Sequence, residues 1–566
     1  MTHRAPVLGL LLTLTLAALA NPHARAQNAE VPTDVQTDVQ TDLKTDVQPP
    51  VATYTDVHDF NTTTLTAPEN PGILAQGRDG NLYGTAPTGG TLGFGGIFRI
   101  TPAGAYSVIY NFDGTMHGKG PRGGLTLGAD GSLYGTTGQG GTSNDGTLFK
   151  ITTAGVLTVL HHFVYTDGTN PYAPPIQGTD GNFYGTCATG GTGAGSVYKM
   201  TPAGVLTPIH IMAFSSGASP EAPLLQGNDG SFYGTTVSGG AAGGDGEVFK
   251  ITPAGVLTVL YSFDFTHGSG PTGGLVQGND GSFYGTTSGG GSLDGGVVFK
   301  LTPAKILTVL YNFSAKPAAT DGKYPDAGLT LATDGFFYGA TSGGGTNGFG
   351  TLYKITPAGS YSILYNFVQA SGSTPQTTLR QHTSGKFYGL ANAGGANSLG
   401  TIFSFDVGLK PFIATLPTSG KVAKAVGILG GGLTGTTNVN FNGTNATFTA
   451  TSNTYITTSV PNGATTGYVN ATTPGGALKS IQKFRVTPSI VSISPASGVV
   501  GSTVTITGVS LTGATKVTFS VGKVAVFTVN SDTKITATVP VGAVTGKISV
   551  STPGGTASGA TVFTVN

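Results

Sequence analysis

Charged residues are scarce in this sequence. Asp, Glu, Lys and Arg make up 9% of its 566 residues, and the formal net charge is +1. A soluble domain typically carries about 25% charged residues. A protein that binds nucleic acid through a basic face needs clustered Lys and Arg to displace the counterions of phosphates. The composition therefore excludes nucleic acid as a partner.

Cysteine and tryptophan are almost absent, with one Cys and no Trp. One thiol cannot build a disulfide framework. Cys187 stands at a repeat position that threonine holds in other units, so we expect a buried free thiol rather than a nucleophile. Glycine, in contrast, accounts for 93 residues and proline for 32, and the 38% hydrophobic content excludes a wholly disordered chain.

The N-terminal segment predicts export. Arg4 precedes an apolar run from Val7 to Ala20, and Ala24-Arg25-Ala26 has the small-x-small pattern of a signal peptidase site. The run is shorter than the roughly 20 residues of a membrane-spanning helix. We expect a signal peptide over residues 1–26, a disordered Thr-Asp-Val-Gln linker over residues 27–50, and no transmembrane segment after cleavage. The protein is then secreted or retained at the bacterial cell surface.

A repeat of about 50 residues fills the middle of the chain, and a Tyr-Gly pair marks each of its seven units. The tyrosines are Tyr83, Tyr134, Tyr184, Tyr233, Tyr284, Tyr338 and Tyr388. In the fifth unit, strand signals at Leu275–Gln277, Ser282–Thr287, Val297–Thr302 and Ile306–Phe313 are separated by turn residues. Four strands with apolar residues on both faces and no helical periodicity are typical of a propeller blade.

The number of strands favours a closed ring over an open solenoid. The first six units each carry a fourth strand, whereas the seventh has none after Thr401–Phe403. A matching strand, Ala52–Phe60, stands before the first unit instead. Its pairing with the last unit would close the circle and remove exposed sheet edges. We therefore predict an all-β fold with a seven-bladed β-propeller over residues 51–406, closed by the N-terminal strand.

Each unit approximates the pattern Asp-Gly-x-x-Tyr-Gly-Thr-Thr, Gly-Gly, Gly-x-Val-Phe-Lys and Thr-Pro-x-Gly. This combination resembles the GloVer tandem-repeat family of exported bacterial proteins, and the match covers all seven units. The resemblance implies export and this general architecture, and it implies no established activity.

The C-terminal third contains two related copies. Leu433-Thr434-Gly435 aligns with Leu511-Thr512-Gly513, and other segments align at offsets of 78 or 79 residues. Short runs of alternating apolar and polar residues indicate antiparallel sandwiches. The segment Ile493–Gly508 resembles the start of an immunoglobulin-like IPT/TIG domain. We predict immunoglobulin-like β-sandwich domains at residues 411–487 and 488–566, which usually serve as spacers or binding modules.

One acidic and one basic residue recur in the first six units. They are Asp79, Asp130, Asp180, Asp229, Asp280 and Asp334, and Arg99, Lys150, Lys199, Lys250, Lys300 and Lys354. One carboxylate per blade does not make a calcium cluster, so a turn role is favoured for the aspartates. In the seventh unit Ser384 and Ser404 replace both residues, so we predict an Asp-to-basic ion pair in most of the six blades. A cationic ring for an acidic polysaccharide is the alternative.

The recurring Phe and Tyr of the second strand, as in Phe283-Tyr284, predict packing between blades rather than a sugar platform. A ligand site usually breaks repeat symmetry, and the connection from each fourth strand to the next blade is what varies. A binding surface is therefore expected on the face where these connections and the Gly-rich loops lie. The candidate binding-face residues are His117, Lys119, Asp167, Asn170, Glu221, His267, Asp321 and Lys323.

No Ser-His-Asp order, paired-His zinc spacing or phosphate-binding Gly motif is evident, so we assign no catalytic, metal or cofactor-binding residue and expect no cofactor. Three functions stay open. The first is a non-enzymatic binding or adhesion protein that presents the loop face to an extracellular polysaccharide or surface protein. The second is a polysaccharide lyase or glycoside hydrolase, which needs two carboxylates or a Tyr/His pair in one cleft at the propeller mouth. The third is a structural repeat protein of the envelope.

Overall fold

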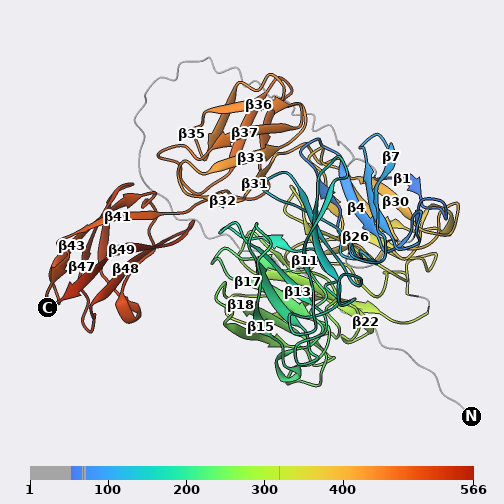
Figure 1. Cartoon of the computed structure of the whole chain (residues 1–566), viewed down its shortest axis with the longest axis horizontal. Coiled ribbons are helices and arrows are strands. Elements are labelled where there is room, and N and C mark those ends of the chain that lie inside the picture. Colours follow the sequence, from blue (N-terminus) through green and yellow to red (C-terminus); the bar gives the residue numbers. More distant parts are fainter. Residues whose placement is uncertain (1–51, 67, 69–71, 318) are drawn as a thin grey trace, which may run out of the picture. The chain divides into compact units, whose positions relative to one another are not determined.

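The computed structural model describes residues 52–66, 68, 72–317 and 319–566, and its regular structure is almost entirely β (Figure 1). Three single turns of 3-10 helix, η1 (Phe214–Ser216), η2 (Gln369–Ser371) and η3 (Ser520–Gly522), are the helical elements of this part. No helix in the described ranges is long and apolar enough to cross a membrane. The predicted signal peptide and linker lie outside the described residues.

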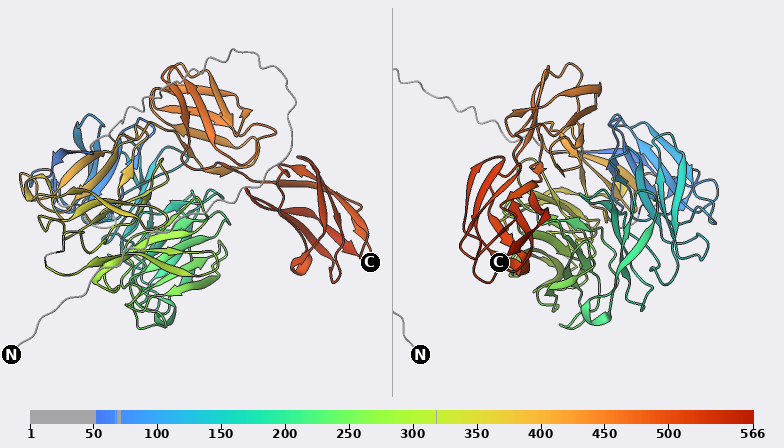
Figure 2. Two further views of the ribbon diagram at one scale, coloured as in Figure 1. Left: turned by 180° about the vertical axis from the view of Figure 1, so that it is seen from behind. Right: turned by 60° about the vertical axis from the view of Figure 1, so that its left-hand side comes forward.

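Seven four-stranded antiparallel sheets make up the repeat region, which we define as residues 52–406 (Figure 2). We number the sheets one to seven in the order of their Tyr-Gly pairs. Sheet five contains β20 (Val276–Gln277), β21 (Phe283–Thr287), β22 (Asp294–Leu301) and β23 (Leu307–Ser314). Its order β20-β21-β22-β23 agrees with the four strands expected from the sequence.

The other sheets repeat this order. Sheet one holds β3 (Ala75–Gln76), β4 (Leu82–Ala86), β6 (Gly96–Ile100) and β7 (Tyr106–Asn111), and a short pair, β2 (Leu65–Thr66) with β5 (Thr88–Gly89), lies beside it in sequence. Sheet two is β8 (Thr126–Leu127), β9 (Leu133–Thr137), β10 (Thr147–Ile151) and β11 (Leu157–His162). Sheet three is β12 (Ile176–Gln177), β13 (Phe183–Cys187), β14 (Ser196–Met200) and β15 (Leu206–Ile211). Sheet four is β16 (Leu225–Gln226), β17 (Phe232–Thr236), β18 (Glu247–Ile251) and β19 (Leu257–Ser262). Sheet six is β24 (Thr330–Leu331), β25 (Phe337–Thr341), β26 (Thr351–Ile355) and β27 (Tyr361–Asn366).

Sheet seven takes its fourth strand from the other end of the repeat region. It consists of β28 (Arg380–Gln381), β29 (Phe387–Ala391), β30 (Thr401–Asp406) and β1 (Thr53–Asp59). β1 runs antiparallel to β30, with Thr53 opposite Asp406 and Asp59 opposite Thr401. The predicted pairing of the N-terminal strand with the last unit is confirmed.

A glutamine side chain links neighbouring sheets, and the same contact is found between sheets seven and one. A glutamine at the end of the first strand accepts a hydrogen bond from a backbone N–H of the preceding sheet, as Gln277 does from Asn228 at 3.1 Å. Gln177, Gln226 and Gln381 accept the same kind of bond. Gln76 of sheet one accepts it from Thr383 of sheet seven at 3.1 Å. Sheet seven therefore contacts sheet one as earlier sheets contact their successors.

The Tyr-Gly signature has a packing cause. Gly285 lies opposite Phe299 in the strand pairing, and a Cβ on Gly285 would stand 2.6 Å from Cζ of that ring. The tyrosine before the glycine packs against the second-strand phenylalanine of the next sheet, with ring centroids 4.1 Å apart for Tyr284 and Phe337. Four more junctions have this Tyr–Phe contact, so the predicted aromatic packing between units is confirmed.

The predicted ion pair is present in only three of the six sheets. Lys199–Asp180, Lys250–Asp229 and Lys300–Asp280 are joined at 3.3, 2.6 and 2.8 Å. Arg99, Lys150 and Lys354 form no such pair with the described residues, so the prediction for most blades was wrong. The constant partner of the aspartate is instead the Tyr-Gly tyrosine, whose hydroxyl donates to it in all six sheets at 2.7 to 3.0 Å.

The spacing of the repeat explains this partner. The aspartate accepts an N–H from the residue two positions on, as Asp280 does from Ser282, and this bond fixes the turn. The tyrosine lies four positions on and holds the other carboxylate oxygen, so neither interaction needs a basic residue. Sheet seven keeps Tyr388 but has Ser384 in place of the aspartate, and it forms a different ion pair, Lys386–Asp406 at 3.4 Å.

Cys187 is buried and free, as predicted. Burial raises the pKa of its thiol far above the ordinary value. It packs with Phe183 and Tyr198 in the core of its sheet, where it acts as a small apolar residue.

Asp56 makes the closing strand sensitive to pH. Burial, with the nearby charge of Asp59, raises the pKa of Asp56 from 3.8 to about 6. Between these two values the folded chain binds more protons than the unfolded chain, so its stability falls as the pH rises through this window. We expect Asp56→Asn to leave the free energy of unfolding nearly unchanged at pH 4 and to increase it at pH 8. Parallel denaturant titrations of both proteins at the two pH values measure this, and equal differences at both would contradict it.

The C-terminal region forms two β-sandwich modules. One sheet of the first module is β31 (Ala414–Leu416), β33 (Ala425–Leu429), β37 (Tyr455–Ser459) and β36 (Phe448–Ser452). The other sheet is β35 (Thr444–Asn445), β34 (Asn438–Phe441), β38 (Val469–Thr473) and β39 (Gly476–Lys479), and β32 (Ser419–Gly420) pairs with β40 (Arg485–Val486). One sheet of the second module is β41 (Ser489–Ser494), β43 (Thr503–Val509), β47 (Lys534–Thr538) and β46 (Phe527–Ser531). The other sheet is β42 (Ser497–Gly498), β49 (Gly555–Val565), β48 (Gly546–Thr552), β44 (Lys516–Phe519) and β45 (Lys523–Val524). Their cores share an edge-to-face aromatic pair, Phe441–Phe484 in one and Phe519–Phe563 in the other.

Candidate functional site

The variable connections and the Gly-rich loops form one surface, which we call the loop face. The connection that leads into each sheet pairs with the Gly-rich loop of that sheet. In sheet two, Lys119 N–H donates to the Gln139 carbonyl at 2.8 Å, and Gln139 N–H donates to the Lys119 carbonyl at 3.2 Å. Equivalent bridges recur in sheets three to seven. The structure thus brings together the two loop classes that the sequence placed on one face.

Most of the candidate residues stabilise their own loops. His117 contacts Asp113 at 2.6 Å, and His267 contacts Asp264 at 2.7 Å. Asp167 contacts His161 at 2.8 Å. Asn170 donates to Thr189 at 2.9 Å, Asp321 accepts from Tyr311 at 2.9 Å, and Lys323 lies over the Tyr324 ring at 5.3 Å. These residues are spread over separate connections and do not converge on one site.

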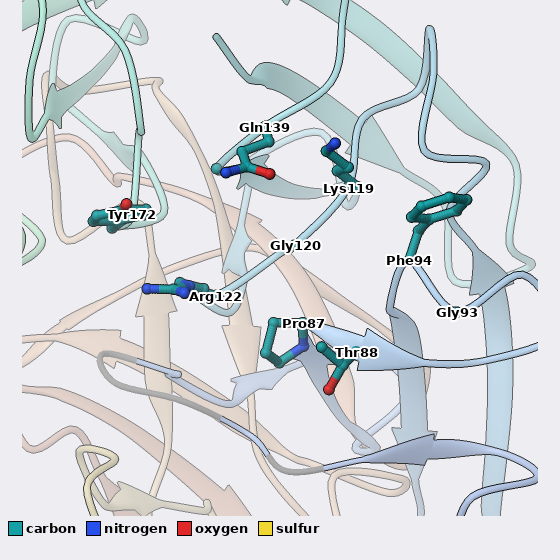
Figure 3. Close-up of a pocket in the computed structure, with 10 residues that line it drawn as sticks. Pro87, Thr88, Gly93, Phe94, Lys119, Gly120, Arg122, Gln139 and Tyr172 are labelled. Atoms are coloured by element: carbon teal, nitrogen blue, oxygen red, sulfur yellow. The ribbon is translucent and has the colours of Figure 1, made fainter. Parts of the chain in front are cut away.

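A cavity of about 260 Å³ lies in the loop face where loops of sheets one, two and three meet (Figure 3). Its side chains include Phe94 from the loop before β6, Lys119 and Arg122 from the connection before β8, Gln139 from the loop after β9 and Tyr172 from the connection before β12. Lys119 alone of the candidate residues lines it.

Backbone hydrogen bonds hold the cavity wall together. Gly120 N–H donates to the Phe94 carbonyl at 3.1 Å, and Gly138 N–H donates to the Gly120 carbonyl at 3.0 Å. Three loops are therefore linked in a row. A Cβ on Gly138 would crowd the Tyr172 ring, 3.1 Å from its Cε1.

The cavity combines positive charge, an amide and aromatic rings. The Arg122 guanidinium lies over the Tyr172 ring, 5.0 Å from its centroid. Arg122 also acts on Glu221: burial raises the pKa of this carboxyl, and the arginine charge opposes the rise. The Lys119 ammonium and the Gln139 amide make no side-chain hydrogen bond or ion pair with the described residues. The Lys119 ammonium and the Gln139 amide can therefore donate to a ligand without breaking such a contact.

The candidates chosen from the sequence missed Arg122, Tyr172, Phe94 and Gln139. A usable signal was present for the first two, because both follow a proline that recurs before the first strands of sheets two to seven. The residues after this proline are Arg122, Tyr172, Glu221, Thr272, Asp326 and Gln376. They differ in every unit, whereas the proline does not. Some contact each other, as Gln376 Nε2 donates to Asp326 at 3.3 Å.

Together these features define an all-β repeat protein with a built loop face and immunoglobulin-like modules. The family model described as Gloeobacter/Verrucomicrobia repeat matches residues 45–192, 124–332 and 308–445, and an IPT/TIG domain model matches residues 488–565. The chain belongs to the Gloeobacter/Verrucomicrobia repeat family, and the resemblances noted in its sequence are confirmed. No curated protein matches the chain.

Solved structures similar to this chain have low TM-scores. A fungal alcohol oxidase in complex with copper is 15% identical over 75% of this chain and 100% of its own, with a TM-score of 0.41. The extracellular domain of a putative hybrid two-component system from B. thetaiotaomicron is 11% identical over 86% and 62%, with a TM-score of 0.41. A surface glycan-binding protein from Prevotella bryantii is 21% identical over 26% and 38%, with a TM-score of 0.21.

Proposed function

We propose that this chain is an exported, non-enzymatic protein that binds an extracellular glycan through the loop face of a seven-bladed β-propeller. The sheets are taken as the blades because the last sheet is completed by β1 and the glutamine contact recurs between sheets seven and one. Closure of this kind removes the exposed edges of an open stack.

The cavity of the loop face carries the proposal. Its side chains break the repeat symmetry, and Lys119 and Gln139 make no side-chain hydrogen bond or ion pair with the described part of the chain. An aromatic ring such as Tyr172 can stack on the apolar face of a sugar, while amide and ammonium groups donate to hydroxyl oxygens. A concave site with a few convergent polar groups is the usual form of a small-ligand site.

The chemistry of the cavity favours binding over cleavage. Glycoside hydrolysis requires two carboxyl groups flanking the bond, about 5 to 10 Å apart. The described lining contains neither a carboxylate nor a histidine. A sugar held there would meet donors and aromatic rings, which position a ligand but supply no general acid and base.

In this proposal, the segments outside the propeller export the chain and present the loop face to the glycan. A signal peptide over residues 1–26 exports the chain, and a linker over residues 27–50 precedes the propeller of residues 51–406. The sandwiches at residues 411–487 and 488–566 act as spacers or as a second contact. The mature protein is secreted or held at the cell surface.

Tyr172→Ala is expected to weaken glycan binding at least about tenfold, since truncation of a central aromatic anchor commonly costs 2 kcal/mol or more. Lys119→Gln should weaken it less, because the amide group still donates hydrogen bonds. A glycan array on the full chain finds the ligand, and calorimetric titration of each variant gives the Kd.

Lys323→Gln is the matched control, because Lys323 pairs with the Gly-rich loop of sheet six as Lys119 does in sheet two but lies outside the cavity. Its Kd should equal that of the original protein. Undiminished binding by Tyr172→Ala would contradict the proposed site. Release of reducing ends from the bound glycan would contradict the non-enzymatic role.

A further inference from the structure

Arg380 is a charged residue at an otherwise uncharged position of the repeat. It stands on β28, the first strand of sheet seven. The equivalent residues of the other sheets are Ala75, Thr126, Ile176, Leu225, Val276 and Thr330. First strands of neighbouring sheets approach closely, since a Cβ on Gly328 of sheet six would lie 2.8 Å from the Gly274 carbonyl oxygen of sheet five. Arg380 therefore lies where the first strands gather.

The guanidinium of Arg380 has no partner in the described chain. Its Nε is buried and makes no hydrogen bond. No ion pair or hydrogen bond joins its other nitrogens to described residues. Burial lowers the pKa of Arg380, and no carboxylate opposes this effect.

The nearest titratable residue in the sequence, just after β28, adds no negative charge. His382 lies two residues on and reaches sheet one, with Nε2 3.0 Å from the Gly80 carbonyl oxygen. Burial lowers the pKa of His382, and the positive charge of Arg380 lowers it further. No carboxylate of the described chain therefore acts on Arg380 as a counter-charge.

Arg380 is half-buried, with its Nε shielded, and a charge that is partly removed from water without a partner is costly, so proteins pair such groups with an opposite charge or with polar ligands. A guanidinium presents five N–H donors in a planar fork that fits two oxygens of a carboxylate, sulfate or phosphate. We propose that Arg380 binds a small oxyanion at the junction of sheets seven and one. This site is separate from the cavity of sheets one to three, and the inference does not depend on glycan binding.

Thermal unfolding of the full chain and of Arg380→Met tests this site. Sodium sulfate, phosphate, acetate and glucuronate are compared with sodium chloride at equal ionic strength, so that inorganic anions and a sugar acid are separate arms. An anion at ten times its Kd should raise the unfolding midpoint of the original protein by about 2 °C more than that of Arg380→Met. Subtraction of the variant removes the general stabilisation by sulfate.

The variant should fold, because Arg380 is half-buried and an apolar side chain of similar length removes a charge that has no partner in the described chain. Lys323→Gln, which removes a half-buried cation elsewhere in the repeat region, should keep the full anion effect. Equal anion effects in the original protein and Arg380→Met would overturn the proposal. Crystals grown with selenate give a test without any variant: anomalous density at the guanidinium supports the site, and its absence overturns it.

Discussion

A chain that begins at residue 62 and therefore lacks β1 unfolds about 10 °C or more below a chain that begins at residue 51. β1 supplies the only strand paired with the outer edge of β30 among the described residues. Its side chains also bind the sheets on both sides. Tyr54 stacks on Tyr365 of sheet six with centroids 4.1 Å apart, and His58 stacks on Tyr106 of sheet one at 3.7 Å.

The size of the effect follows from burial. Phe60, directly after β1, is fully buried, and removing a buried phenylalanine side chain alone costs about 3 to 5 kcal/mol. The deletion also removes the hydrogen bond from the Tyr54 hydroxyl to the Ser371 carbonyl and exposes the edge of β30. Aggregation of the shortened chain is a further expected result.

Scanning calorimetry of the two shortened chains measures the difference, and the chain that begins at residue 51 controls for loss of the N-terminal segment. A synthetic peptide of residues 52–62, added in trans, should restore part of the lost stability by re-forming the pairing with β30. If the chain that begins at residue 62 keeps the same midpoint, the pairing contributes little and the case for a closed ring fails.

The strand count could be predicted from the sequence because it depends on local signals. The Tyr-Gly period and the turn residues mark each strand. The seventh unit lacks a fourth strand, and one additional strand stands before the first unit. The partner of the recurring aspartate was predicted wrongly. Two polar groups can reach this carboxylate, and alternation along a strand does not say which of them does. The tyrosine four positions on is fixed by packing, whereas the lysine is free to point elsewhere.

The candidate site was predictable as a face but not as a set of residues. Polar side chains in variable loops mostly satisfy groups in their own loop, as Asp113 and His117 do. The cavity arises where connections from consecutive sheets converge, and spacing along one connection does not contain that information. Arg122 and Tyr172 were within reach of sequence reasoning, because they vary beside a constant proline.

Gly285→Ala is expected to lower the free energy of unfolding by about 1 to 3 kcal/mol, the usual cost of overpacking a filled core. Gly285 has an ordinary φ, so the cost arises from space alone: the new Cβ would stand 2.6 Å from Phe299 and 3.0 Å from Leu275. Gly289→Ala is the matched control in the same sheet. Its Cβ would meet nothing nearer than 3.9 Å, so stability should be unchanged or slightly higher.

A double variant separates lack of space from loss of backbone freedom. Phe299→Leu shortens the ring that crowds the new methyl group, so Gly285→Ala should cost less in that background than in the original protein. Urea unfolding of the four proteins gives the interaction energy directly. An equal cost of Gly285→Ala in both backgrounds would show that the glycine is not required by the aromatic residue opposite. If Gly285→Ala costs less in the Phe299→Leu background, the result explains why Tyr-Gly recurs in every unit. The third-strand aromatic ring then occupies the space that any Cβ would need.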